Sequence, residues 1–303
     1  MTKAEVCRIS DFIQFHDASC LADTIVGPLA EYLKLVGYDN QEMLEEAVLF
    51  YSLTYCVPTT IIMLNKLEEF KQNPEAFWAK YKEKLIFQSD RKYVKMNNSF
   101  VGAYIDFKKR KIFDKLRGQK ILDLENTVKL IQECYGFGRF SAFLFIETYD
   151  AIFDCKFTDN KLDWLNGSTV TSGMFNVLGE DEKANEWDKT HKLCIDTEYF
   201  DNMANELLEK VNNGKKLAIL ETNLCAYRKL FKGTRYLGYY SDRVLEELYR
   251  TIANFPDVRN QLDILFLARE MVIPSKYLGE KHGWTGIRKN MKKYYLENGD
   301  WRW

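Results

Sequence analysis

The stretch that decides the fold is 124–149, with the sequence LENTVKLIQECYGFGRFSAFLFIETY. Apolar residues recur at helical spacing in its first half, at Leu124, Val128, Ile131 and Tyr135. A second apolar run, Phe143 to Ile146, follows the two glycines. Glycine is needed where the chain takes a positive φ or lets another backbone come close. The pattern therefore predicts two helices joined by a tight glycine turn.

This hairpin has two interpretations. It is either a plain αα-hairpin with a glycine cap, or a phosphate site made by the unpaired amides and the dipole at the start of the second helix. The segment G-F-G-R-F-S-A at 136–142 resembles the helix-hairpin-helix motif of DNA glycosylases, G-x-G-[RK]-x-[ST]-A. That element grips the backbone of one DNA strand through main-chain amides. The resemblance implies that Gly136, Gly138 and Arg139 contact DNA.

The chain departs from the glycosylase motif. Cys134 and Tyr135 stand where Leu-Pro is usual, and Phe140 occupies the position where lyase members carry lysine. Asp159 follows at roughly the spacing of the catalytic aspartate, but without the usual threonine and histidine after it. The DNA grip is thus expected without the glycosidic-bond chemistry. A monofunctional glycosylase that uses Asp159 stays an alternative.

Composition favours an all-α protein with a glycosylase-like helical fold. The 303 residues are 46% hydrophobic and 15% aromatic, which argues against disorder. Only five prolines and no long alternating segments favour helices over strands. A chain of this length can form one helical domain over 1–303, or two closely packed lobes at about 1–120 and 121–303.

Helical periodicity predicts further elements outside the hairpin. The expected helices span 21–36, 41–55, 59–70, 196–211, 217–230, 242–252 and 257–271. Val57 and Pro58 are expected to close the second of these, and Gly173 and Gly179 to punctuate a short helix. The acidic stretch 180–188 is interpreted as an exposed face or an insertion.

Cysteine and histidine usage argues against a zinc or histidine-based metal site. The seven cysteines are scattered without a C-x-x-C pair, as in a reduced cytosolic protein, and the three histidines are far apart. The segment Met1–Glu5 lacks the apolar core of a signal peptide, and no run approaches membrane-spanning length. We therefore expect a cytoplasmic protein without a membrane partner.

The net charge of −1 hides an uneven distribution. Thirteen Lys or Arg face four acids over 80–120, whereas fourteen acids face six bases over 150–210. The run Lys108, Lys109, Arg110 and Lys111 is either a solvated face or, since it precedes the hairpin, a phosphate-binding surface.

Three polar clusters could carry chemistry, because no P-loop, Rossmann fingerprint or nucleophile elbow occurs. Ser168 and Thr169 form either a helix cap or an anion-binding turn. Glu221 follows an apolar half-turn, so it is either a base with a raised pKa or part of a structural ion pair.

The third cluster surrounds the turn at 235–243. Asp242 could cap a helix while Arg243 faces solvent. Arg235 and Arg243 could instead clamp a phosphate, with Tyr239 and Tyr240 stacking on an extruded base.

The order of these blocks resembles a phage family. The blocks are L-F-Y-x-L-T-Y-x-V-P-T at 49–59, Y-G-F-G-R-F at 135–140, W-L-N-G-S at 164–168, E-x-x-L-C-A-Y-R-K at 221–229 and R-Y-L-G-Y-Y-x-D-R at 235–243. They are similar to those of the α-glutamyl/putrescinyl thymine pyrophosphorylases, also called amino acid:DNA transferases, and to the helical domain of phage 5-hydroxymethyluracil DNA kinases. The resemblance spans about 49–243.

This resemblance implies a transferase in the infected bacterial cell, acting on double-stranded phage DNA. An amino acid or putrescine would displace pyrophosphate from a pyrophosphorylated 5-hydroxymethyluracil, leaving a base–CH₂–NH–R product. No cofactor is implied with certainty, and Mg²⁺ bound to the pyrophosphate is compatible with it. An accessory DNA-binding protein is the alternative outside enzymes.

The resemblance implies a separate role in that reaction for each of several residues. Glu221 would take the amine proton, and Arg243 is expected to face the same pocket from a neighbouring helix. The leaving pyrophosphate would be balanced by Arg91, Arg235, Arg243 and the Ser168 turn. Further residues expected at the site are Asp242, Thr169, Trp164, Tyr239 and Tyr240.

Overall fold

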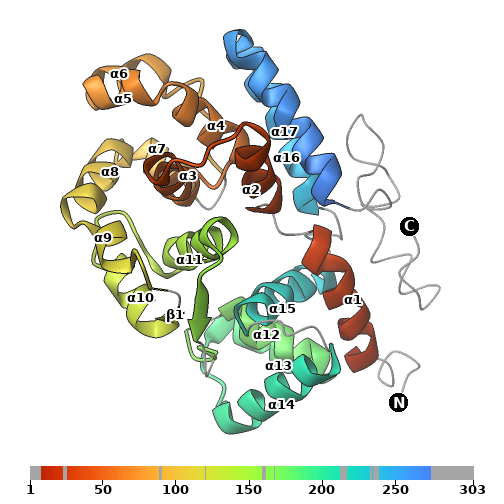
Figure 1. Ribbon diagram of the computed structural model, residues 1–303. Helices are drawn as coiled ribbons and strands as arrows, with labels where there is room; N and C mark the ends of the chain where they lie inside the picture. The colour runs from red at the N-terminus through yellow and green to blue at the C-terminus, as the bar shows by residue number, and fades with distance from the viewer. Residues whose placement is uncertain are drawn as a thin grey trace. The chain divides into compact units, whose positions relative to one another are not determined.

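Helices dominate the computed structural model, which confirms the all-α expectation (Figure 1). The structure describes residues 8–22, 26–88, 91–119, 121–158, 162–166, 168–211, 217–232, 234 and 239–273. Within these ranges, two short strands, β1 (Ile121–Asp123) and β2 (Lys156–Thr158), pair in parallel with Ile121 opposite Lys156. They tie together the two ends of the predicted hairpin.

The chain divides into two compact units, crossing between them near residues 24, 158, 242 and 273. The unit that we call the hairpin unit covers 25–158 and 243–273. The second, called the network unit after a hydrogen-bond network described below, contains the described parts of 1–24 and 159–242. These boundaries differ from lobes meeting at about residue 120, because the hairpin packs on helices from the first third of the chain.

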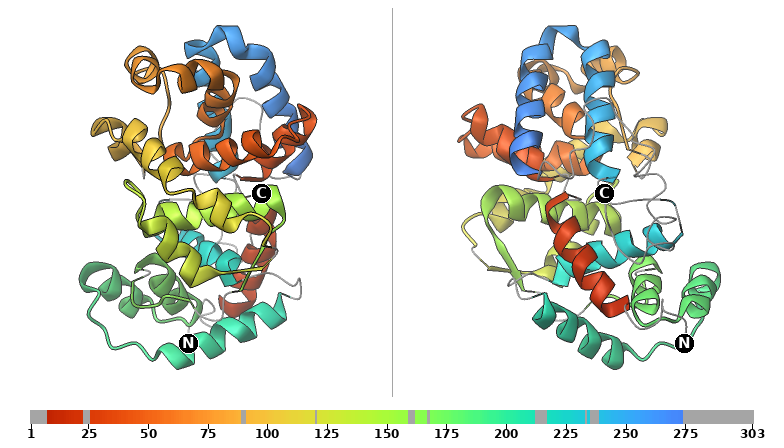
Figure 2. Two further views of the ribbon diagram at one scale, coloured as in Figure 1. Left: turned by 60° about the vertical axis from the view of Figure 1, so that its left-hand side comes forward. Right: turned by 90° about the vertical axis from the view of Figure 1, so that its right-hand side faces the viewer.

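The hairpin unit is built mostly from short helices (Figures 1 and 2). These are α2 (Val26–Leu35), α3 (Gln41–Thr54), α4 (Val57–Asn65), α5 (Leu67–Gln72), α6 (Pro74–Tyr81), α7 (Lys92–Met96), α8 (Phe100–Lys109), α9 (Ile112–Leu116), α10 (Leu124–Gln132) and α11 (Arg139–Phe153). The later chain adds the 3₁₀ helix η2 (Pro256–Val258), α17 (Arg259–Val272) and, from Arg243 on, α16 (Tyr239–Asn254).

Helix α3 forms the centre of this unit and packs against α11 and α4. Asn40 caps its start by accepting a hydrogen bond from the Glu42 amide at 2.8 Å. Tyr55 ends it in the left-handed region, with φ of 52°, and Pro58 stands in the first turn of α4. The predicted break at Val57 and Pro58 is therefore confirmed, and every residue from Ala47 to Leu53 is buried.

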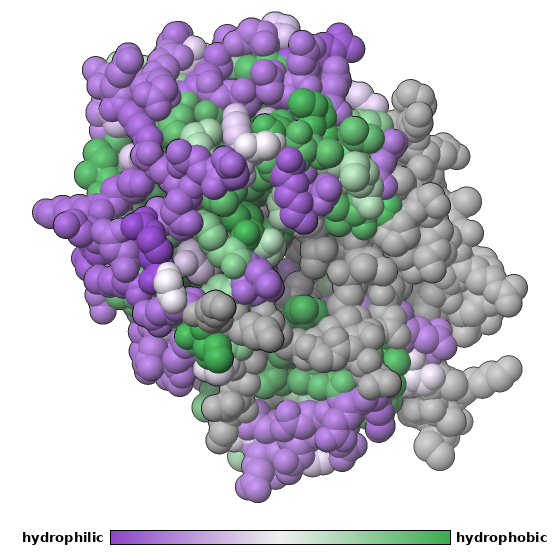
Figure 3. Space-filling model, viewed as in Figure 1, coloured by the Kyte–Doolittle hydropathy of each residue, from purple (hydrophilic) through white to green (hydrophobic). Residues whose placement is uncertain are grey.

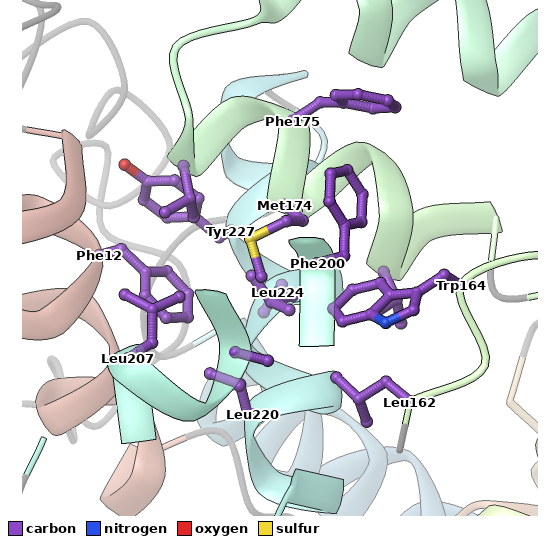
Figure 4. Packing of buried hydrophobic residues seen from close by; sticks show 14 of the residues in the cluster. Phe12, Leu162, Trp164, Met174, Phe175, Phe200, Leu207, Leu220, Leu224 and Tyr227 are labelled. Atoms are coloured by element: carbon purple, nitrogen blue, oxygen red, sulfur yellow. The ribbon is translucent and has the colours of Figure 1, made fainter. Parts of the chain in front are cut away.

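The network unit contains α1 (Arg8–Ala22), α12 (Ser168–Val177), α13 (Asp181–Thr190), α14 (Thr197–Lys210) and α15 (Leu217–Phe231). Helices α12, α1 and α14 pack against α15, and α13 packs against α12; Figure 2 shows α1 lying beside α15. Figure 4 shows the core, in which Phe12, Met174, Leu224 and Tyr227 come together from three of these helices.

Three expectations about elements need correction. The helix predicted over 21–36 is α2, and α1 precedes it. The acidic stretch 180–188 is not merely an exposed face, since most of it belongs to α13, which buries Ala184 and Trp187. Gly173 lies inside α12 rather than at its end. A Cβ at Gly173 would lie 2.2 Å from the carbonyl oxygen of Leu224, so glycine is required there by the close packing of α12 on α15.

Candidate functional site

The hairpin predicted from the sequence is present, and its two glycines differ in what the fold demands of them. Gly136 has φ of +78°, and a Cβ there would lie 3.0 Å from the Cβ of Ala103. Gly138 has an ordinary φ of −99° and open space where a Cβ would be. The fold therefore requires glycine at 136, whereas at 138 neither the backbone conformation nor a close contact requires it.

Gly138 is the N-cap of α11. Its amide donates to Ser141 Oγ at 2.9 Å, and the same hydroxyl donates back to the Gly138 carbonyl at 3.1 Å. After the turn, the Ala142 amide donates to the Gly138 carbonyl at 3.0 Å. The first helical amides lack intrahelical acceptors by geometry and lie at the positive end of the helix dipole, which suits an anion such as phosphate.

Arg91 supports the turn from behind. Its side chain is 1% exposed and donates to the carbonyls of Gly136 at 3.2 Å and Leu53 at 3.3 Å, and to the hydroxyl of Tyr93. Burial lowers the pKa of Arg91, against the opposing effect of Tyr93. The sequence predicts Arg91 as a phosphate ligand, but these contacts make it a positioning residue that fixes the glycine turn.

The basic run next to the hairpin divides into inward and outward members. Lys108 pairs with the fully buried Glu46 at 2.8 Å, and Arg110 pairs with Asp106 at 2.9 Å and with Glu133 at 3.6 Å. Lys109 and Lys111 are exposed. Of the four basic residues, these two are the best placed to meet phosphates.

A buried ion pair that the sequence did not reveal lies on α16. Arg243 Nε donates to Glu247 Oε1 at 3.2 Å, and both side chains are at most one-tenth exposed. Burial raises the pKa of Glu247 from 4.5 to about 7, although Arg243 and a hydrogen bond with Cys56 oppose the rise. The pKa of Glu247 thus lies near neutral pH, which suits proton transfer.

Aromatic rings surround this pair and connect it to the hairpin. Arg243 lies over the Tyr55 ring at 5.6 Å, and Tyr55 meets Phe140 edge to face at 5.4 Å. Tyr51 is completely buried, and its hydroxyl has no hydrogen-bond partner in the described part of the chain. An unsatisfied buried hydroxyl costs about 1–3 kcal/mol.

Sequence reasoning missed Glu247 for an identifiable reason. Its only sequence signal is its position one turn after Arg243, and such i, i+4 pairs are common on exposed helix faces. The burial of both residues is a tertiary property.

The predicted pairing of Glu221 with Arg243 stays a prediction. Glu221 lies on α15, partly exposed, in the network unit, whereas Arg243 belongs to the hairpin unit. Arg243 is buried and pairs with Glu247, so the alternative in which Arg243 faces solvent is wrong.

The remaining predicted residues are spread over the network unit. Trp164 is buried against Phe200 and donates to Asp201 at 2.7 Å, which gives it a core position (Figure 4). Thr169 is a partly exposed residue of α12, and Ser168 begins that helix. Outside the described residues or side chains lie Asp159, Arg235, Tyr239, Tyr240, Asp242 and the side chain of Ser168.

A second polar cluster in this unit is a saturated network. Arg228, 3% exposed, donates to Asp188 Oδ2 at 2.8 and 3.1 Å, to Asn176 at 3.0 Å and to Asn185 at 2.7 Å. Asp188 also accepts from Ser172 at 2.6 Å and Lys232 at 2.8 Å. Its pKa is lowered, because these hydrogen bonds outweigh the burial that acts in the opposite direction.

No group of three or more His, Cys, Asp or Glu side chains in the described residues could hold a metal ion. Likewise, none of the helices described is both long and apolar enough to cross a membrane. Comparisons with family models, with curated proteins and with solved structures found no match to this chain.

Proposed function

We propose that this protein has a helix-hairpin-helix, glycosylase-like fold, binds phage DNA through the 136–138 turn and modifies a base. The observation that carries the proposal is Gly138. A glycine with ordinary φ and open space at its Cβ position serves an approaching backbone better than it serves the fold. The resemblance to amino acid:DNA transferases supports the reaction that follows.

The reaction is the transfer of an amine to the 5-methylene carbon of a pyrophosphorylated 5-hydroxymethyluracil. The amine nitrogen forms a bond to that carbon, and the carbon–oxygen bond to pyrophosphate breaks, with the electron pair leaving on the pyrophosphate. The proton lost by the nitrogen passes to a carboxylate. Holding the amine and the base together supplies the entropic part of the acceleration.

Two carboxylates are candidates for the proton acceptor. The sequence predicts Glu221, whereas the raised pKa of Glu247, about 7, and its link through Tyr55 to the hairpin favour Glu247. Replacing the base should lower turnover by roughly 10²–10⁴-fold while leaving DNA binding intact. A higher pH should partly rescue that variant, because more of the amine is already deprotonated.

The activity is tested by incubating pyrophosphorylated phage DNA with a pool of amines and measuring nucleoside masses. Wild-type protein should produce the base–CH₂–NH–R product. Of the two variants Glu221→Gln and Glu247→Gln, the one whose turnover falls by roughly 10²–10⁴-fold identifies the base. Free base and abasic sites would instead indicate a glycosylase. DNA binding with no change in nucleoside mass would indicate an accessory protein.

DNA binding is tested with matched glycine variants. Gly138→Leu should fold normally and bind duplex DNA at least about tenfold more weakly, because the side chain blocks the approach of a phosphate. Gly136→Ala should instead lower the melting temperature, since it combines a positive φ with a tight contact. Unchanged affinity of a folded Gly138→Leu protein would rule out the hairpin as the DNA site.

The contribution of basic side chains to DNA binding is tested with variants that do not destabilise the fold. The double variant Lys109→Gln/Lys111→Gln should weaken DNA binding. It should also reduce the slope of log affinity against log salt concentration by an amount that corresponds to up to about two phosphate contacts. Lys108 is unsuitable for this test, because its replacement would leave the buried Glu46 carboxylate without its ion-pair partner. Lys183→Gln/Lys210→Gln, which removes two exposed lysines of the network unit, is the control.

A further inference from the structure

Three exposed aromatic side chains belong to the glycine turn or contact it. Tyr135 is 57% exposed, Phe140 48% and Tyr93 43%. Tyr135 and Phe140 flank the two glycines in sequence, and the Tyr93 hydroxyl donates to the Gly136 carbonyl at 3.4 Å. Figure 3 shows hydrophobic residues exposed among hydrophilic ones on the face it presents.

Each of these rings is held in place while about half of it stays open to solvent. The Tyr135 ring lies on Gly102, 3.3 Å from where a Cβ would be, and its amide donates to Asp106 at 2.8 Å. Phe140 is held by the edge of Tyr55, and Tyr93 by Arg91. Glycine inside a helix such as α8 costs roughly 0.5–1 kcal/mol, and at Gly102 it provides the seat for Tyr135.

Fixed, exposed rings beside an anion-binding turn match the chemistry of unpaired nucleotides. Bases stack on aromatic faces irrespective of sequence, at about 1–3 kcal/mol per base, while backbone phosphates bind to amides and basic groups. The helix N-terminus at Gly138 and the exposed Lys109 and Lys111 supply the second set of contacts. In an intact duplex the base faces are covered by stacking and offer nothing to these rings.

We propose that Tyr93, Tyr135 and Phe140 form a base-stacking rim around the hairpin, which selects DNA whose bases are unpaired or unstacked over intact duplex. This inference rests on the proposed DNA-binding function, and it names locally opened DNA as the substrate class. The rings are already ordered in the free protein, so binding carries little further entropic cost for them. An unstacked base that binds is therefore stabilised by nearly the full stacking energy.

The test is equilibrium binding, by fluorescence anisotropy, of three labelled 20-nucleotide probes: a single strand, a matched duplex and a duplex with a three-nucleotide bulge. Wild-type protein should bind the single strand and the bulge at least about tenfold more tightly than the matched duplex. Tyr135→Ala and Phe140→Ala should each lose roughly 5–150-fold for the unpaired probes, as loss of one stacked base predicts. Their matched-duplex affinity should change less than about twofold.

The control variant is Tyr199→Ala, which removes a tyrosine of the network unit that is 48% exposed and should bind all probes like wild type. Melting temperatures verify that each variant folds, and Phe140→Leu provides a second replacement that keeps the contact with Tyr55 apolar. Equal wild-type affinity for all three probes would overturn the stacking rim while leaving DNA binding in place. Failure to bind any probe would reject the proposed function as well. Variants that change the oligomeric state but not DNA affinity would assign the rings to a protein interface and also overturn the proposal.

Discussion

Arg228 with Asp188 in the network unit and Arg243 with Glu247 in the hairpin unit are buried arginine–carboxylate pairs that behave in opposite ways. In the network unit, Asp188 receives hydrogen bonds from Arg228, Ser172 and Lys232, and its pKa is lowered. In the hairpin unit, Glu247 receives one bond from Arg243 at 3.2 Å and one from Cys56, and its pKa rises to about 7.

The difference shows that the supply of donors, rather than the presence of an arginine, decides the charge state of a buried carboxylate. Glu247 is 6% exposed at its side chain and Asp188 16%, so Glu247 also loses more hydration. A saturated pair holds helices together. A pair with fewer donors leaves the pKa of its carboxyl near neutral pH.

The largest effect is expected from breaking the saturated pair. Arg228→Met should destabilise the network unit by about 3–5 kcal/mol, because Asp188, Asn176 and Asn185 lose a buried partner together. Urea denaturation followed by tryptophan fluorescence suits this measurement, since Trp164 and Trp187 lie in that unit's core. Lys232→Met removes a half-exposed partner of Asp188 and should cost under about 1 kcal/mol. Equal losses in the two variants would contradict the comparison.

The second effect concerns the dependence of stability on pH. Because the pKa of Glu247 is raised from 4.5 to about 7, its protonated form favours the folded state, and that contribution is lost as the pH rises from about 4.5 to 7. The loss should reach about 3 kcal/mol, and Glu247→Gln should remove it.

Asp188→Asn should show the opposite sign. Because the pKa of Asp188 is lowered, its contribution is present above the ordinary value of 3.8 and lost as the pH falls through the folded pKa. Both variants are compared with wild type by chemical denaturation from pH 3 to pH 8. Difference profiles that run parallel for the two variants would refute the assignment of opposite roles.

The smallest effect compares one glycine from each unit. Gly173→Ala places a methyl group against the backbone of Leu224 and should cost about 1–3 kcal/mol through forced separation of α12 and α15. Gly138→Ala places the methyl group in open space and should cost under about 1 kcal/mol. Thermal melting distinguishes them, and similar melting temperatures for both variants would argue against the different purposes assigned to these glycines.

Local signals in the sequence predicted the local structure well. The hairpin and the break before Pro58 depend on neighbours within a few residues, and both are observed. The mid-helix position of Gly173 was not predictable, because its cause is Leu224, 51 positions away on another helix.

The candidate site was predictable only in part, for the same reason. The glycines of the turn carry a sequence motif, whereas the inward direction of Lys108 depends on Glu46 and the role of Arg91 depends on Leu53 and Gly136. The raised pKa of Glu247 results from its burial beside Tyr51 and Cys56, which lie about 190 positions away in the chain, so no single stretch of sequence encodes it.

Helix α1 has a consequence for how the protein is made. Its Arg8 pairs with Asp181, 173 positions later, and its Phe12 packs against Tyr227 at 5.2 Å on α15. A ribosome adds about 5–20 residues per second, so Asp181 is synthesised roughly 9–35 s after Arg8. Throughout that interval the apolar face of α1, with Phe12 and Phe15, has no native partner. The first described helix of the chain is thus among the last to dock during synthesis, and a nascent chain stalled before α15 presents this face to chaperones.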